Sequence, residues 1–155
     1  NTHESVKLTL DTGHMLFAKG DSKSILQNYY ERILHVHCKD IRKQVLEKSL
    51  KEDLSFRGAF LEGAFTVPGD GCIDYQPLFN VLKNNNYSGW LVVEAEQDPA
   101  KANPLEYAKI GYKYLTDTLK KSAFISRFNI PSHTVSSSNF ISSSEESSVS
   151  EGFSF

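Results

Sequence analysis

Ionisable side chains stand at the ends of three apolar segments of this sequence. The segments are LTLD, ILHVHC and WLVVEAE, and the side chains are Asp11, His35, His37, Glu94 and Glu96. Residues two apart in a β-strand point to the same face, so each strand would present its polar groups together. Carboxylate and imidazole groups are the oxygen and nitrogen ligands of Mn²⁺, Co²⁺, Zn²⁺ and Mg²⁺. Three such strands lying side by side would form a divalent metal site.

The elements that must position these residues alternate between strand and helix periodicity. The expected strands are residues 5–11, 33–40 and 90–96, and the expected helices are residues 22–33, 41–53, 74–84 and 103–121. Strands joined by helical crossovers must pair in parallel, so the pattern predicts an α/β fold. The carboxyl ends of parallel strands meet at one edge of the sheet, where such folds place their chemistry. Asp11, the His35 and His37 pair, and the Glu94 and Glu96 pair are therefore expected to converge at this edge.

A competing interpretation starts from the triplet Asp-Thr-Gly at residues 11–13. Aspartic proteases present their catalytic carboxylate in this triplet, where it shares a proton with a second aspartate. Those enzymes are built almost entirely from strands, and a small residue follows their glycine. Here the bulky His14 follows, and long helices are expected. The sequence therefore disfavours a protease.

Composition excludes several classes of protein. The chain has 155 residues, 39% of them hydrophobic, which predicts one globular domain with a substantial core. A net charge of −2 provides no field for nucleic acid or for an anionic membrane surface. No apolar run is long enough to cross a bilayer, and Cys38 and Cys72 lack the spacing of a metal site. We therefore expect a cytoplasmic protein without a structural disulfide, and neither nucleic acid nor membrane as a partner.

The composition changes after residue 121. The stretch SSSNFISSSEESSVSEG is dominated by serine and has few residues that could form a core. We divide the chain into an α/β unit at residues 1–121 and a disordered, serine-rich tail at residues 122–155.

Four segments together resemble the C-terminal half of the myo-inosose-2 dehydratase family. They are DTGHMLFAKGD, ILHVHCKD, FTVPGDGCIDYQPLFNVL and YSGWLVVEAEQDPAKANPLEYAKIGYKYL, and the resemblance covers nearly all of residues 8–119. This family lies within the xylose isomerase-like TIM barrels, which include sugar isomerases and epimerases. The resemblance implies about strands six to eight of a (β/α)8 barrel, and hence a piece of a longer enzyme. The implied partners are a separately encoded N-terminal half or further copies of the chain.

The resemblance also implies which residues hold the metal. Asp11, His37 and Glu94 match the family's ligands on its last three strands, whereas the ligand of the fifth strand has no counterpart here. The implied ion is Mn²⁺ or Co²⁺, with glutathione as an additional helper. His35 is expected to support the strand, and Cys38 to be a small buried apolar residue.

The implied reaction removes water from scyllo-inosose, a cyclic polyol ketone, to give a trihydroxycyclohexane-1,2-dione in inositol catabolism. In that reaction Glu94 is the candidate base and His14 the candidate acid, so both are expected to be catalytic. The expected substrate contacts are His14, Lys39 and Glu96.

Two alternatives stay open at this point. A sugar isomerase or epimerase would use the same barrel and metal without releasing water. A truncated, non-catalytic chain would instead use its serine-rich tail for docking. A trinuclear zinc endonuclease is disfavoured, because the sequence has too few further ligands and no basic charge excess.

Overall fold

The ionisable residues lie on a sheet of parallel strands in the computed structural model, which describes residues 2–122 and the backbone of residues 150–154. The strands are β1 (Leu8–Asp11), β2 (Ile33–Cys38), β3 (Asp40–Ile41), β4 (Phe65–Thr66), β5 (Trp90–Glu94) and β6 (Ser150–Ser154). The helices are α1 (Thr12–Phe17), α2 (Ser22–Tyr29), α3 (Lys43–Lys51), α4 (Phe56–Leu61), α5 (Gln76–Asn84) and α6 (Pro104–Lys121), with a 3-10 turn η1 (Tyr30–Arg32).

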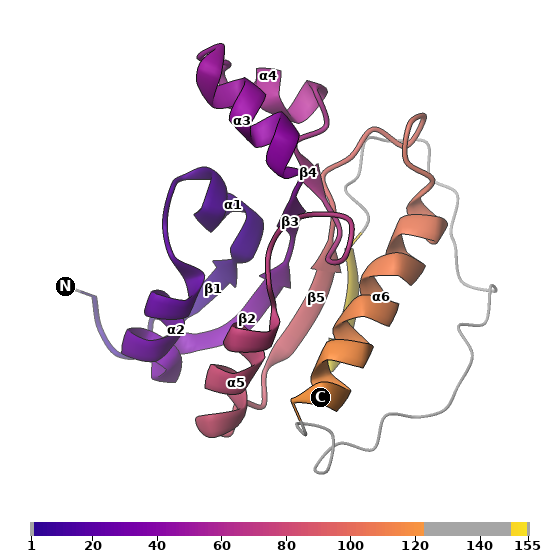
Figure 1. Ribbon diagram of the computed structural model, residues 1–155. Coiled ribbons are helices and arrows are strands. Elements are labelled where there is room, and N and C mark those ends of the chain that lie inside the picture. Colours follow the sequence, from indigo (N-terminus) through magenta and orange to yellow (C-terminus); the bar gives the residue numbers. More distant parts are fainter. Residues whose placement is uncertain (1, 123–149, 155) are drawn as a thin grey trace.

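The larger sheet has the order β1-β2-β5-β6 (Figure 1). β1 pairs with β2 and β2 pairs with β5, both in parallel. The register sets Asp11 opposite His37, and His37 opposite Val92. The α/β class and the parallel pairing expected from the sequence are therefore confirmed.

Helices α2, α5 and α6 cover one face of this sheet (Figure 1). The core between the two layers is apolar, and its members include Leu26 from α2, Phe79 from α5 and Leu115 from α6. The α6 helix begins where the sequence predicts, because the Asn103 side chain accepts a hydrogen bond of 3.2 Å from the backbone N–H of Glu106. The helical layer leaves the carboxyl ends of the strands free for polar residues.

Four short elements near the carboxyl ends of β1 and β2 were not expected from the sequence, namely α1, α4, β3 and β4, whereas α3 lies within the helix expected at residues 41–53. Helix α1 follows β1 directly, because the Asp11 carboxylate caps it by accepting a 2.8 Å bond from the His14 N–H. After β2 the chain makes an excursion through α3 and α4, and the two-residue strands β3 and β4 pair antiparallel within it. Figure 1 shows α3 and α4 beyond the tips of the central strands. The excursion thus lies beside the predicted metal site.

Of the predicted disordered tail, the structure describes Ser122 and the backbone of residues 150–154. Ser122 caps the end of α6, and β6 pairs antiparallel with the whole of β5. An unpaired edge on β5 would expose a row of N–H and C=O groups, which β6 satisfies. The other residues of the predicted tail, 123–149 and 155, lie outside the described part of the chain. Within the described helices, none has the length and apolar character that crossing a membrane requires.

Candidate metal centre

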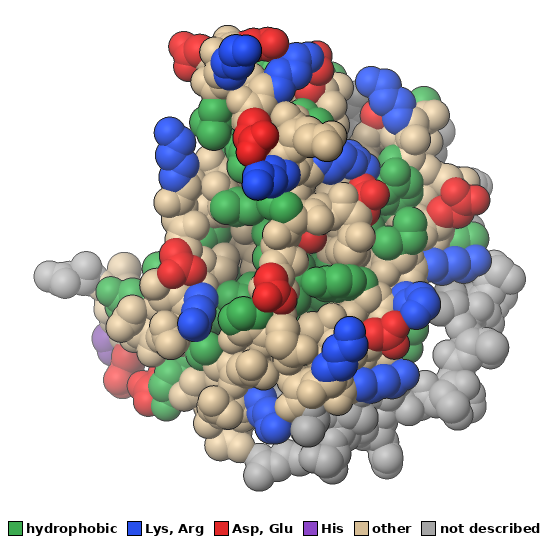
Figure 2. Space-filling model, in the orientation of Figure 1, with side chains coloured by type: hydrophobic (Ala, Val, Ile, Leu, Met, Phe, Trp, Pro, Cys, Tyr) green, Lys and Arg blue, Asp and Glu red, His purple; other side chains and the backbone are tan. Residues whose placement is uncertain are grey.

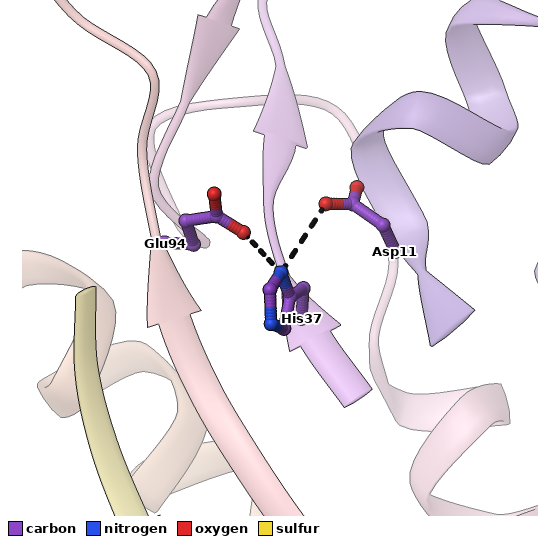
Figure 3. A group of neighbouring side chains, drawn as sticks. All are labelled: Asp11, His37 and Glu94. Carbon is purple, nitrogen blue, oxygen red and sulfur yellow. Dashed lines mark ion pairs between the residues drawn. The ribbon is translucent and has the colours of Figure 1, made fainter. Parts of the chain in front are cut away.

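Asp11, His37 and Glu94 meet at the carboxyl ends of three adjacent strands (Figure 3). Each side chain offers one ligand atom, and these atoms all lie within 4.8 Å of one another. Nδ1 of His37 stands between the carboxylates, in contact with Oε2 of Glu94 and 3.7 Å from Oδ2 of Asp11. The structure therefore brings together the three residues that the sequence predicts as ligands.

Lys39 lies in the same cluster and is almost entirely buried, with 1% of its side chain exposed. Its ammonium nitrogen is 3.2 Å from Oδ2 of Asp11 and 3.3 Å from Oε1 of Glu94. It is also 3.2 Å from Oε2 of Glu96. A buried ammonium is tolerated only where charges of opposite sign compensate it, as these three carboxylates do.

The charges of the cluster suit a divalent cation. Three carboxylates against one ammonium leave a formal charge of −2 when the imidazoles are neutral. Oε2 of Glu94 is buried and has no hydrogen-bond partner among the described residues, although it faces His37. A carboxylate oxygen in that state is poorly solvated and favours a cation. Two carboxylates and an imidazole are also a suitable donor set for Mn²⁺, Co²⁺ or Zn²⁺, so the residues fit such an ion.

His14 and Glu96 extend the cluster toward the surface. Nε2 of His14 is 3.0 Å from Oε2 of Glu96 and 3.0 Å from Nζ of Lys39. Burial would raise the pKa of Glu96, but the hydrogen bond with His14 and the positive charge of Lys39 outweigh it, so this pKa lies below its usual value. Glu96 therefore holds its negative charge beside His14 and Lys39.

Two other residues of β2, His35 and Cys38, lie near His37 but are not candidate ligands. The His35 ring makes an edge contact with the His37 ring, with centroids 5.1 Å apart. Burial and the neighbouring His37 lower the pKa of His35, which favours a neutral ring. Cys38 is fully buried, and burial raises the pKa of its thiol well above the usual value. Cys38 is thus a small core residue, as expected.

A family model described as xylose isomerase-like TIM barrel matches residues 1–118 of this chain. The chain belongs to this family. The similar curated proteins include inosose dehydratases. The chain is 56% identical over 117 residues to the inosose dehydratase of Clostridium beijerinckii. It is 53% identical over 114 residues to that of Bacillus velezensis, and 49% identical over 114 residues to that of Lactiplantibacillus plantarum.

These alignments cover 75%, 74% and 74% of the chain, but only 39%, 38% and 38% of the three relatives. The chain therefore spans less than two fifths of the length of the curated relatives that it matches. The resemblance to xylose isomerase-like barrels and to inosose dehydratases is confirmed. That the matched part is the C-terminal portion of the barrel stays a prediction.

A buried hydroxyl pair, which the sequence did not indicate, fixes the end of β2 in this xylose isomerase-like chain. The Thr12 hydroxyl lies 2.7 Å from the carbonyl oxygen of Lys39 and 2.7 Å from the Tyr75 hydroxyl. The Tyr75 hydroxyl in turn donates to the Lys39 carbonyl at 3.0 Å. Both side chains are fully buried, so these bonds are shielded from water. They hold the backbone from which the Lys39 side chain enters the cluster.

Gly13, the glycine of the Asp-Thr-Gly triplet, leaves space for the side chain of Lys39. A Cβ atom on Gly13 would lie 2.7 Å from Cγ of Lys39 and 3.0 Å from its Cβ. Real Cβ atoms do not approach other atoms so closely. The triplet therefore supplies a carboxylate of the candidate metal centre, a buried hydroxyl and space for the Lys39 side chain, and the protease interpretation does not apply.

Proposed function

We propose that this chain carries the metal-binding end of an inosose dehydratase, a hydro-lyase that removes water from scyllo-inosose. The observation that carries the proposal is the convergence of Asp11, His37 and Glu94 within 4.8 Å at the carboxyl ends of parallel strands. Relatives named inosose dehydratase, at 49% to 56% identity, support this substrate over a ketose that is isomerised without loss of water. The product would be a trihydroxycyclohexane-1,2-dione.

Asp11, His37 and Glu94 would hold the divalent cation in this proposal. A divalent cation held by these residues, Mn²⁺ or Co²⁺, would supply Lewis acidity to the substrate. The carboxylate of Glu94 would take the proton from the carbon next to the ketone. It lies among the candidate ligands, with Oε1 3.3 Å from the Lys39 ammonium and Oε2 in contact with Nδ1 of His37.

His14 would deliver a proton to the departing hydroxyl. Nε2 of His14 faces a donor, the Lys39 ammonium, and an acceptor, the Glu96 carboxylate, each at 3.0 Å. The neutral nitrogen accepts from Lys39, and the protonated nitrogen donates to Glu96, so either protonation state has a partner. The Lys39 ammonium also stabilises negative charge that develops on the substrate oxygens. His14, Lys39 and Glu96 are the proposed contacts with the substrate.

We propose that the complete enzyme includes further chain, because this chain spans less than two fifths of the length of the relatives named inosose dehydratase. In this proposal β1, β2 and β5 are strands six to eight of a (β/α)8 barrel, in which the first strand would take the place that β6 has beside β5. β1 would pair with a fifth strand supplied by an N-terminal half or by another copy. β1 stands at the edge of the described sheet, where such a strand would add. Glutathione as a helper and a cytoplasmic location stay predictions.

The test is an assay of scyllo-inosose consumption and dione formation with Mn²⁺, run on the chain alone and with its N-terminal complement. Glu94→Gln removes the base and should lower kcat by two or more orders of magnitude, about the contribution of a general base. Ketose formation without release of water would reject the dehydratase in favour of an isomerase. Full activity of Glu94→Gln would reject Glu94 as the base.

A further inference from the structure

An exposed phenylalanine belongs to a cluster of aromatic rings beside the metal centre. Phe56 has 49% of its surface exposed and opens helix α4. Its ring lies edge-on to the His14 ring, with centroids 5.7 Å apart, and its centroid is 5.4 Å from that of Phe65. The cluster formed by His14, Phe17, Phe56 and Phe65 adjoins the ionic residues directly, because the Lys39 ammonium lies 5.6 Å from the centroid of Phe65.

The position of Phe56 is fixed by the local structure. The Ser55 hydroxyl caps α4 by accepting a 3.1 Å bond from the Gly58 N–H, so the first turn that carries Phe56 is held in place. At the other end of α4, the carboxylate of Glu62 accepts a 2.6 Å bond from Lys48 on α3. A ring held in this way loses little conformational freedom when a ligand packs on it.

We propose that the exposed face of Phe56 is the wall on which the ring of a cyclic polyol packs when its oxygens face the metal centre. This inference rests on the proposed function and adds the residue that recognises the apolar part of the substrate. In scyllo-inosose the hydroxyl groups are equatorial, so the ring C–H bonds are axial and both faces of the ring are apolar. The oxygens around the rim then point outward, toward the polar cluster.

The proposed geometry matches how small-molecule sites divide their contacts. Aromatic walls bind the apolar faces, and a few convergent polar groups set the orientation. His14 belongs to both sets, since its ring lies nearly perpendicular to that of Phe56, with centroids 5.7 Å apart, and its Nε2 is 3.0 Å from Oε2 of Glu96. An open-chain ketose has no flat C–H face of this kind, so the wall would favour rings over chains.

The test is ligand-observed NMR with the 155-residue chain, Mg²⁺ and scyllo-inosose. Saturation of the protein's aromatic protons should transfer to the ring C–H protons of the bound ketone. Phe56→Ala should weaken binding about 10-fold and remove most of that transfer, whereas Phe56→Tyr should restore both. Leu61→Ala is the matched control, because Leu61 lies on the same helix and is 59% exposed.

The outcomes separate this inference from the proposed function. If the parent chain binds the ketone and Phe56→Ala binds it equally well, with undiminished transfer, the aromatic wall is rejected and the proposed function stands. If the parent chain binds no cyclic polyol, the aromatic wall on this chain is rejected, whereas the proposed function is decided separately by the dehydration assay with the N-terminal half. If Phe56→Ala fails to fold by circular dichroism, Phe56→Leu decides, because it keeps the apolar volume without the aromatic ring.

Discussion

Replacing Lys39 by methionine tests whether its ammonium group compensates the negative charge of the carboxylates in the candidate metal centre. The substitution keeps most of the aliphatic side chain and removes the ammonium group. Three carboxylates would then lie close together with no buried cation among them. We expect Lys39→Met to lower the stability of the chain strongly without metal, and to make added Mn²⁺ more stabilising than it is in the parent.

The distances set the size of the effect. The ammonium lies 3.2 Å from oxygens of Asp11 and Glu96 and 3.3 Å from an oxygen of Glu94. At an effective dielectric constant of about 20, one such pair attracts by about 5 kcal/mol before the cost of desolvation is subtracted. Removing one partner of a buried ionic group has a net cost of about 3–5 kcal/mol. For a chain of this length the melting temperature should fall by on the order of 10 °C.

The assay is thermal unfolding by circular dichroism with and without Mn²⁺, at neutral pH. The matched control is Lys43→Met, because the Lys43 side chain is 71% exposed and 3.9 Å from its partner Glu47. An exposed pair of this kind contributes under about 1 kcal/mol. If Lys39→Met and Lys43→Met melt at the same temperature and respond equally to Mn²⁺, the role of Lys39 as counter-charge is refuted.

Three further predictions concern the ligands, the hydroxyl pair and the acidic pH range. Asp11→Ala combined with His37→Ala should abolish Mn²⁺ binding by isothermal titration, and binding retained by the double variant would place the ion elsewhere. Thr12→Val should lower the free energy of unfolding in urea by about 1–3 kcal/mol, since buried bonds are lost, whereas Thr12→Ser should restore most of it. The pKa of Glu96 is lowered, so its ionised form stabilises the fold above its usual pKa, and this contribution is lost as the pH falls through the lower folded-state value. The stability gap between the parent and Glu96→Gln, measured in urea over a pH series, should therefore close on acidification, and a constant gap would contradict the assignment.

The main strands and helices were predictable because each is long enough to show its period. β2 has apolar residues over much of its six positions, and β5 has them in four of its five. Helix α6 has both a capping asparagine and a proline at its start. Helices α1 and α4 have six residues each, less than two turns, so no apolar stripe can be recognised in them. β3 and β4 have two residues each and are shorter than any periodic signal.

The candidate ligands were predictable for a different reason. Parallel strands align their carboxyl ends, so the ionisable residues at the ends of the three strands were expected to converge, and the resemblance to the dehydratase family selected Asp11, His37 and Glu94 among them. The environment of Phe56 could not be predicted, because its neighbours come from α1 and β4, elements with no sequence signal of their own. The same holds for Tyr75, which reaches Thr12 only through the tertiary packing of the fold.

Because Gly13 lies so close to Lys39, the residues tolerated at position 13 depend on the residue at position 39. A larger residue at position 13 has no room while the lysine stem passes over it, with Cγ only 2.7 Å from where a Cβ would stand. Substituting Gly13 by alanine and Lys39 by a residue with a shorter stem should therefore be less harmful together than the two separate effects suggest. Variant libraries of this protein should randomise positions 13 and 39 jointly. A library that varies position 13 alone would lose substitutions that are tolerated only together with a change at position 39.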